Sequence, residues 1–290
     1  MAAVIKESAR VYQHVMNELA DPRTAGWFLA SSPWPMIAIL VIYLYLVKKA
    51  GPRYMKDREA YELRKSMLVY NVIQILFSVY LVYEALMSGW WDDYSYRCQP
   101  IDFSDNPKAV RMARACWCYM ICKVVELLDT VLLCYFVLRK KSNQISYLHL
   151  YHHTFMPVCS WIGVKFFAGG HGTLLGLINS FVHIIMYSYY LFAGLGPRFQ
   201  KYLWWKKHLT TMQMVRFQYS LLGVDLVSTP GRSVQFAIVF VHSAQNIVFE
   251  CNYPKVIVVL LCVNSIYFFS MFGSFYRRIY SKGSSTRKDS

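Results

Sequence analysis

The sequence predicts an all-α membrane protein that crosses the bilayer seven times. Of its 290 residues, 56% are hydrophobic and only 16% are charged, whereas a soluble domain carries about 25% charged residues. Several apolar runs approach the roughly 20 residues that a helix needs to cross a bilayer. Basic residues also concentrate in every second connecting loop, which is the positive-inside pattern of membrane proteins.

The apolar runs give the order of the predicted spans. Spans 1 to 5 are expected at residues 34–47, 66–87, 112–138, 145–164 and 172–194, and span 7 at 254–276, while span 6 has no clear bounds. The sequence contains no internal repeat and no long linker, so we expect one membrane domain over residues 1–290.

The basic loops also orient the chain. Lysine and arginine gather after spans 1, 3, 5 and 7, which indicates a lumenal or extracellular N-terminus and a cytosolic C-terminus. An even number of spans would break this alternation. The net charge of +15 therefore reflects cytosolic loops, and we expect no nucleic-acid partner.

Two cysteines are expected to pair. Six of the eight fall inside predicted spans, whereas Cys98 and Cys251 fall in loops on the non-cytosolic side. That side is oxidising in the secretory pathway, so we predict a Cys98–Cys251 disulfide. Two free thiols are the alternative.

Charged residues in the third predicted span form the first candidate cluster. Lys123, Glu126 and Asp129 follow one another at intervals of three residues, which keeps them near one side of a helix. Charges within a membrane usually face the bundle interior and pair with one another. They either hold helices together or also position a reacting group, and the two roles are compatible.

Histidines form the second cluster. In "HLYHH", His149, His152 and His153 lie at positions i, i+3 and i+4 and so share one helical stripe. In the next span, "NSFVHIIMYSYY" places Asn179, His183 and Tyr187, with Tyr190 beyond them, on a similar stripe. Rows of tyrosines in membrane helices often serve only to pack helices together. Three histidines and an Asn–His pair at membrane depth are hard to explain by packing alone. These stripes are expected to converge in one buried chamber.

Three kinds of chemistry fit such polar stripes. A di-iron site, as in membrane desaturases and hydroxylases, needs about eight clustered histidines, and the eight of this chain are too scattered. A zinc site is possible with three or four ligands, but no cysteine or carboxylate has a ligand spacing to the histidine box. A transporter with a proton relay would need polar residues along a path through both faces. These readings stay as alternatives.

Imidazole chemistry without a metal fits best. A neutral histidine is both a nucleophile and a general base near neutral pH. It could attack a thioester and hold the acyl group. The basic cytosolic loops, with Arg139, Lys140, Lys206 and Lys207, could bind the phosphates of coenzyme A.

The ordered motifs resemble those of the very-long-chain fatty acid elongase (ELO) family. "KVVELLDT" matches K-x-x-E-x-x-D-T, "HLYHH" matches H-x-x-H-H, and "NSFVHIIMYSYY" matches N-x-x-x-H-x-x-M-Y-x-Y-Y. The resemblance runs over almost the whole chain, from "SSPWP" to "FYRRIY".

The resemblance implies a seven-helix enzyme of the endoplasmic reticulum, with spans 2–7 around a buried acyl-chain tunnel. Such a 3-oxoacyl-CoA synthase condenses a long-chain acyl-CoA with malonyl-CoA and releases CO₂ and coenzyme A, and no metal or other cofactor is implied. By carry-over, His152 accepts the acyl group and His183 assists the second half-reaction. The supporting residues would be His149, His153, Asn179, Lys123, Glu126, Asp129, Tyr187, Gln213 and Gln235. Partners would be membrane lipid and the ketoreductase, dehydratase and enoyl reductase of the elongation cycle, and a homodimer is allowed.

One departure from the family pattern lies near span 6. The motif T-x-x-Q-x-x-Q begins with Thr210 and Gln213, but Arg216 occupies its last position. Joining Val215 directly to Gln235 restores the motif, so residues 216–234 are interpreted as an insertion that interrupts span 6. We expect it to form a cytosolic loop or to weaken activity. Residues 281–290 are expected to be a cytosolic tail.

Overall fold

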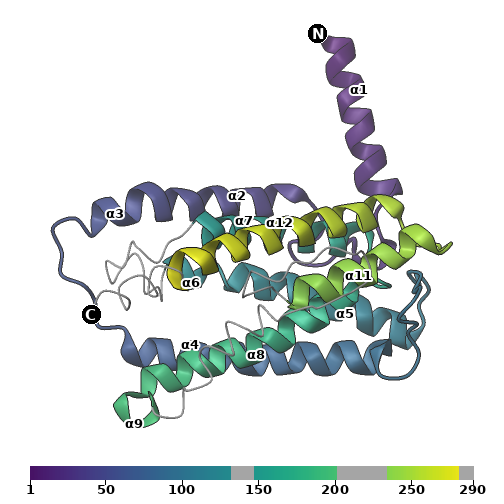
Figure 1. The fold of residues 1–290 in the computed structure, drawn as a ribbon. Coiled ribbons are helices and arrows are strands. Elements are labelled where there is room, and N and C mark those ends of the chain that lie inside the picture. Colours follow the sequence, from purple (N-terminus) through teal and green to yellow (C-terminus); the bar gives the residue numbers. More distant parts are fainter. Residues whose placement is uncertain (132–146, 201–233, 281–290) are drawn as a thin grey trace. The chain divides into compact units, whose positions relative to one another are not determined.

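The computed structural model describes residues 1–131, 147–200 and 234–280, and within these ranges the chain is helical and contains no strand (Figure 1). Three stretches are long and apolar enough to cross a membrane, namely Pro33–Tyr54, Arg64–Trp90 and Thr173–Leu195. The all-helical class and the membrane-spanning character are therefore confirmed. The count of seven spans and the tunnel stay predictions.

Most predicted spans correspond to helices within a few residues. The first two correspond to α2 (Pro33–Tyr45), continued by η3 (Leu46–Ala50) and α3 (Gly51–Tyr54), and to α4 (Arg64–Ala85), continued by η4 (Leu86–Trp90). Spans 4, 5 and 7 correspond to α7 (Tyr147–Phe166), α8 (Thr173–Leu195) and α12 (Lys255–Tyr280). Where span 6 had no clear bounds, the structure has α11 (Val234–Val248). The remaining elements are α1 (Ala2–Gln13), η1 (His14–Glu18), η2 (Pro22–Thr24) and α9 (Pro197–Gln200).

The third predicted span differs from the structure, which breaks it into two helices. Helix α5 (Pro107–Val125) begins five residues earlier than expected, because Pro107 occupies the first helical position and the Asn106 side chain accepts a hydrogen bond from the backbone N–H of Lys108. It ends in a tight turn, where Leu127 N–H donates to the Val124 carbonyl three residues back. Helix α6 (Leu128–Val131) follows. A single helix starting at residue 112 was therefore wrong.

The described helices belong to two compact units. The first unit comprises Met1–Tyr70, Tyr83–Tyr94 and Ile101–Thr173, and the second comprises Asn71–Val82, Ser95–Pro100 and Leu174–Ser290. Helix α4 contributes residues to both. The first unit contains the "KVVELLDT" and "HLYHH" motifs, and the second contains the "NSFVHIIMYSYY" motif.

The core of the first unit lies where α2, α5 and α7 pack together. Helix α7 is in contact with both of the others, and the buried cluster combines Met36, Leu40 and Tyr43 of α2 with Met120 of α5 and Trp161 and Val164 of α7. Each helix buries one stripe of side chains in this cluster. The packing fixes the rotation of α5 and α7 about their axes and therefore the direction of their polar residues.

A buried arginine ties together the loops at one end of this unit. The Arg23 guanidinium pairs with Asp21 at 2.6 Å and donates to the carbonyls of Asp102, Ala109 and Ala168. These acceptors lie beside the start of α5 and the end of α7. A buried guanidinium needs such partners, because an unpaired charge there would be costly. Arg23 thus joins the N-terminal segment to both helices.

The second unit contains the predicted disulfide. Helices α11 and α12 pack against each other (Figure 1), and the short segment between them includes Cys251. Its Sγ atom lies 1.99 Å from that of Cys98, and the two Cα atoms are 5.6 Å apart. The bridge closes a sequence separation of 153 residues. Cys98 and Cys251 are therefore paired, as predicted from their places in loops expected on the non-cytosolic side.

Candidate active site

The turn that ends α5 contains a buried ion pair. Lys123 Nζ lies 2.8 Å from Glu126 Oε1 and 3.0 Å from Oε2, and both side chains are about 2% exposed. The Cys122 thiol donates to the same carboxylate at 3.5 Å, and the ammonium lies 4.8 Å from the centre of the Tyr119 ring. Both charges thus have partners, as buried charges require. Asp129 follows on α6, half-buried.

The three histidines of α7 form a contiguous row of rings. The centre of the His153 ring lies 4.2 Å from that of His149 and 5.5 Å from that of His152. All three side chains are partly buried. Helix α5, which ends at the turn with the ion pair, packs against α7. The structure therefore confirms that the "HLYHH" histidines share one stripe.

His149 is the end of a hydrogen-bonded series that includes two hydroxyl groups from other helices, those of Thr130 and Tyr43. The Tyr43 hydroxyl of α2 donates to Thr130 Oγ1 at 3.1 Å, and Thr130 Oγ1 lies 2.8 Å from His149 Nε2. Thr130 is completely buried. Because Thr130 receives the tyrosine proton, its own hydroxyl proton is available for Nε2. This series of hydrogen bonds favours the neutral tautomer of His149 with its proton on Nδ1.

Replacing Thr130 by valine is expected to weaken this connection without changing the volume of the side chain. Tyr43 and His149 would each lose a buried partner, so we expect the free energy of unfolding to fall by about 1–3 kcal/mol. The control is Thr154→Val, because the Thr154 hydroxyl donates only within its own helix, to the Leu150 carbonyl at 2.7 Å. Thermal unfolding in detergent compares the two. Equal losses in both variants would contradict a special role for Thr130.

The second unit holds the other polar stripe, on α8. His183 is buried, and its ring centre lies 5.6 Å from that of Tyr187, which is almost completely buried. Tyr190 continues the row at 6.2 Å but is exposed, and Asn179 lies one turn before His183. His183 and Tyr187 thus share one buried face of α8, as their spacing predicted. Convergence of this face with the α7 histidines stays a prediction.

Several predicted residues lie outside the described ranges. These are Gln213 and the four residues expected to bind coenzyme A, which are Arg139, Lys140, Lys206 and Lys207. The insertion at 216–234 also lies outside them except for Val234, the first residue of α11, and so does the tail at 281–290. Gln235 is the second residue of α11. Their roles stay predictions.

No sequence pattern pointed to Tyr43, which contributes to the site from α2. It lies 87 residues before Thr130 and resembles many other tyrosines of this chain. Thr130 closes the "KVVELLDT" motif, so the motif pointed to it, but not to its bond with His149. Only the packing of α2 against α7 brings these groups together.

Comparisons with known proteins identify the family of this chain. The model of the GNS1/SUR4 (ELO) family matches residues 28–288. The chain is 44% identical to a very long chain fatty acid elongase of Aedes aegypti, over 97% of this chain and 72% of that protein. It is 44% identical to very long chain fatty acid elongase 7 of Drosophila melanogaster, over 93% of this chain and 76% of that protein. With human very long chain fatty acid elongase 1 the identity is 42%, over 94% of this chain and 90% of that protein.

A match over most of the chain, together with relatives well above 30% identity, shows the family. The buried motifs described above are the ones by which the sequence resembled it. The chain therefore belongs to the GNS1/SUR4 (ELO) family of fatty acid elongases and is an enzyme of fatty acid chain elongation.

Proposed function

We propose that this protein condenses a long-chain acyl-CoA with malonyl-CoA to a 3-oxoacyl-CoA that is two carbons longer. The observation that carries the proposal is the row of three imidazole rings on α7, in contact with one another and tied to Thr130 at one end. Within a family of fatty acid elongases, such a row can supply both a nucleophile and a proton carrier.

In the proposed first half-reaction, His152 attacks the thioester carbonyl of the acyl-CoA. A bond forms between its imidazole nitrogen and the acyl carbon, the C–S bond breaks, and the ring proton passes to the departing thiolate of coenzyme A. His153 is the neighbour through which this proton can move, since its ring contacts His152. The product is an acyl-histidine, which survives only where water is excluded.

In the proposed second half-reaction, malonyl-CoA loses CO₂, and the resulting enolate attacks the acyl carbon. The C–N bond to His152 breaks, and the imidazole recovers a proton from solvent. His183, with Asn179, would assist this step by stabilising the enolate or supplying the proton. Its buried position beside Tyr187 is compatible with such a role.

The remaining roles follow from charge and position. The Lys123–Glu126 pair would hold the turn that orients α6 and Thr130, with Asp129 beside it. The basic residues Arg139, Lys140, Lys206 and Lys207 would bind the phosphates of coenzyme A, and Gln213 and Gln235 would line the site. We propose the endoplasmic-reticulum membrane as the location, with the C-terminus cytosolic, because the 3-oxo product needs a ketoreductase, a dehydratase and an enoyl reductase next.

The direct test expresses the protein in cells that lack elongases. Membranes from these cells are then incubated with carbon-labelled malonyl-CoA and a panel of saturated and unsaturated acyl-CoAs. We expect labelled 3-oxoacyl-CoA from at least one acyl-CoA and release of CO₂ in equal amount. A variant without residues 216–234 is assayed in parallel, and we expect it to be at least as active.

The failures can be told apart. No labelled product from either form would overturn the condensation. Product from the shortened form alone would show that the insertion blocks an otherwise intact enzyme. Iron or zinc in stoichiometric amount in the purified protein, together with no labelled 3-oxoacyl-CoA, would favour the metal-dependent oxidoreductase.

A further inference from the structure

The N-terminal helix α1 is amphipathic, and none of its residues is buried. At 100° per residue, Val4, Ile5, Val11 and Tyr12 fall within one arc of the helix together with Ser8. Lys6, Arg10 and Gln13 fall on the opposite side, and Glu7 lies at the edge of the apolar arc, next to Val11. Among the helices that the structure describes, this one segregates apolar from polar residues most strongly and has almost no net hydrophobicity. It leaves an apolar surface uncovered.

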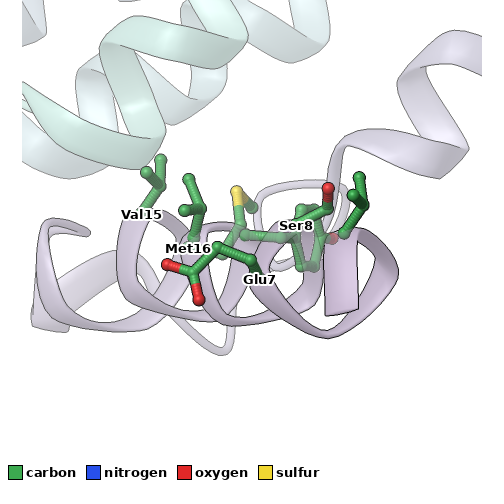
Figure 2. A pocket seen from close by; sticks show the side chains of 7 residues that line it. Glu7, Ser8, Val15 and Met16 are labelled. Carbon is green, nitrogen blue, oxygen red and sulfur yellow. The ribbon is translucent and has the colours of Figure 1, made fainter. Parts of the chain in front are cut away.

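The apolar arc forms a shallow groove that continues into η1. Val4, Glu7, Ser8, Val11, Tyr12, Val15 and Met16 line it. Figure 2 shows these side chains along one helical stretch, with Glu7 as its charged member. Val4 and Val11 remain more than half exposed, whereas Met16 is packed into the core of the first unit. The groove is thus open along α1 and anchored at its C-terminal end.

The segment after η1 is bonded to the end of α7 and leads into α2, the start of the candidate membrane span Pro33–Tyr54. Thr24 donates to the Val164 carbonyl in the last turn of α7, the Trp161 indole donates to the Leu29 carbonyl, and Lys165 Nζ donates to the Ser31 carbonyl. Helix α2 then begins at Pro33. The base of α1 is therefore at the level where α7 ends and α2 begins.

Exposed aromatic residues mark the same level. Phe28, Trp34 and Trp91 are each at least 64% exposed. Phe28 and Trp34 flank the start of α2, and Trp91 follows the end of η4 in the same unit. Such rings concentrate at the boundary between the hydrocarbon core and the lipid headgroups. Two observations thus place the base of α1 at the membrane surface: the hydrogen bonds to the end of α7 beside the start of α2, and the exposed aromatic rings there.

We propose that α1 lies in the interfacial layer of the same bilayer that its chain spans, with its apolar arc among the upper acyl chains of phospholipids. A 12-residue helix is about 18 Å long, too short to cross a core of roughly 30 Å. The apolar and polar arcs are those of a helix that lies in the plane of a membrane. The bilayer is the occupant because the segment that follows α1 and η1 is bonded to the end of α7 and leads into the candidate span that begins at Pro33, and exposed aromatic residues flank that point.

Apolar burial, rather than charge, would hold the helix there. Arg10 pairs with Glu7 at 3.2 Å, and His14 lies 2.6 Å from Glu18, so little net charge is left for acidic headgroups. We therefore expect contact with uncharged phosphatidylcholine and little dependence on salt. This proposal does not rest on the condensation reaction.

The test places a fluorescent amino acid at Val4 or, in a second protein, at Gln13 of the full chain, reconstituted in phosphatidylcholine nanodiscs. We expect a lipid with a nitroxide near its headgroup to quench the probe at Val4, and dissolved iodide to quench the probe at Gln13 several-fold more strongly. Equal quenching of both probes by iodide would overturn the proposal. A Val4 probe that is shielded from iodide but not quenched by the lipid would also overturn it, since a protein would then cover the groove.

Two substitutions in the Val4-probe protein sharpen the result. Val11→Glu puts a charge into the apolar arc and is expected to abolish quenching by the lipid, whereas Gln13→Glu adds the same charge to the polar side and is expected to leave it intact. Circular dichroism checks that the remaining helices are unchanged. Full lipid quenching in the Val11→Glu protein would overturn the proposal.

Discussion

His152→Ala is expected to abolish formation of the acyl-enzyme. When the wild-type protein is incubated with acyl-CoA alone, intact-protein mass spectrometry should show one added acyl group and release of one coenzyme A. The alanine variant should show neither, and its overall turnover should fall at least ~10³-fold, as for loss of a nucleophile elsewhere. The reason is that no carbon–nitrogen bond can form without the attacking imidazole.

The variant His183→Ala separates the two half-reactions. It should still accept the acyl group from acyl-CoA but lose about 10²–10⁴-fold in condensation with malonyl-CoA, the range for general acid–base catalysis. His14→Ala is the matched control, because the His14 side chain is exposed. An acyl-enzyme that forms at the wild-type rate in His152→Ala would show that another group is the nucleophile.

Lys123→Met is expected to have the largest effect on stability. It leaves the Glu126 carboxylate buried without its cation, and breaking a buried pair in this way costs about 3–5 kcal/mol. Replacing both partners, as in Lys123→Met with Glu126→Leu, removes both charges and should recover most of that loss. Thermal unfolding of detergent-solubilised protein compares the three forms.

The double variant also tests whether the pair positions the site. If the ion pair orients the turn that carries Thr130, the folded double variant should form the acyl-enzyme about 10²-fold more slowly than the wild type, since small misplacements cost that much. A double variant with wild-type stability and wild-type acylation would show that the pair only stabilises the fold. A double variant as unstable as Lys123→Met would contradict the expected compensation.

Local periodicity explains why much of the site could be predicted. His149 and His153 are four residues apart, and Lys123 and Glu126 three apart, so one helical segment or turn brings each pair together whatever surrounds it. The same holds for His183 and Tyr187 on α8. The disulfide was predictable because loop charge assigned both cysteines to the oxidising side.

Contacts between distant segments could not be predicted in this way. The bond from Tyr43 to Thr130 joins residues 87 positions apart, and the bonds of Arg23 reach up to 145 positions along the chain. The break after Val125 also escaped prediction, because the apolar pattern continues through the turn. Such features depend on which helices pack together.

By itself, the sequence determined the helical membrane class, the family, the histidine and ion-pair motifs and the pairing of Cys98 with Cys251. These depend on composition, on helical period and on which side of the membrane each loop occupies. Only the tertiary structure decided that Thr130 and Tyr43 hold His149, that α5 ends before α6, and that the apolar arc of α1 stays uncovered. The physical reason is that packing between helices selects partners across long sequence separations, where no local pattern specifies them.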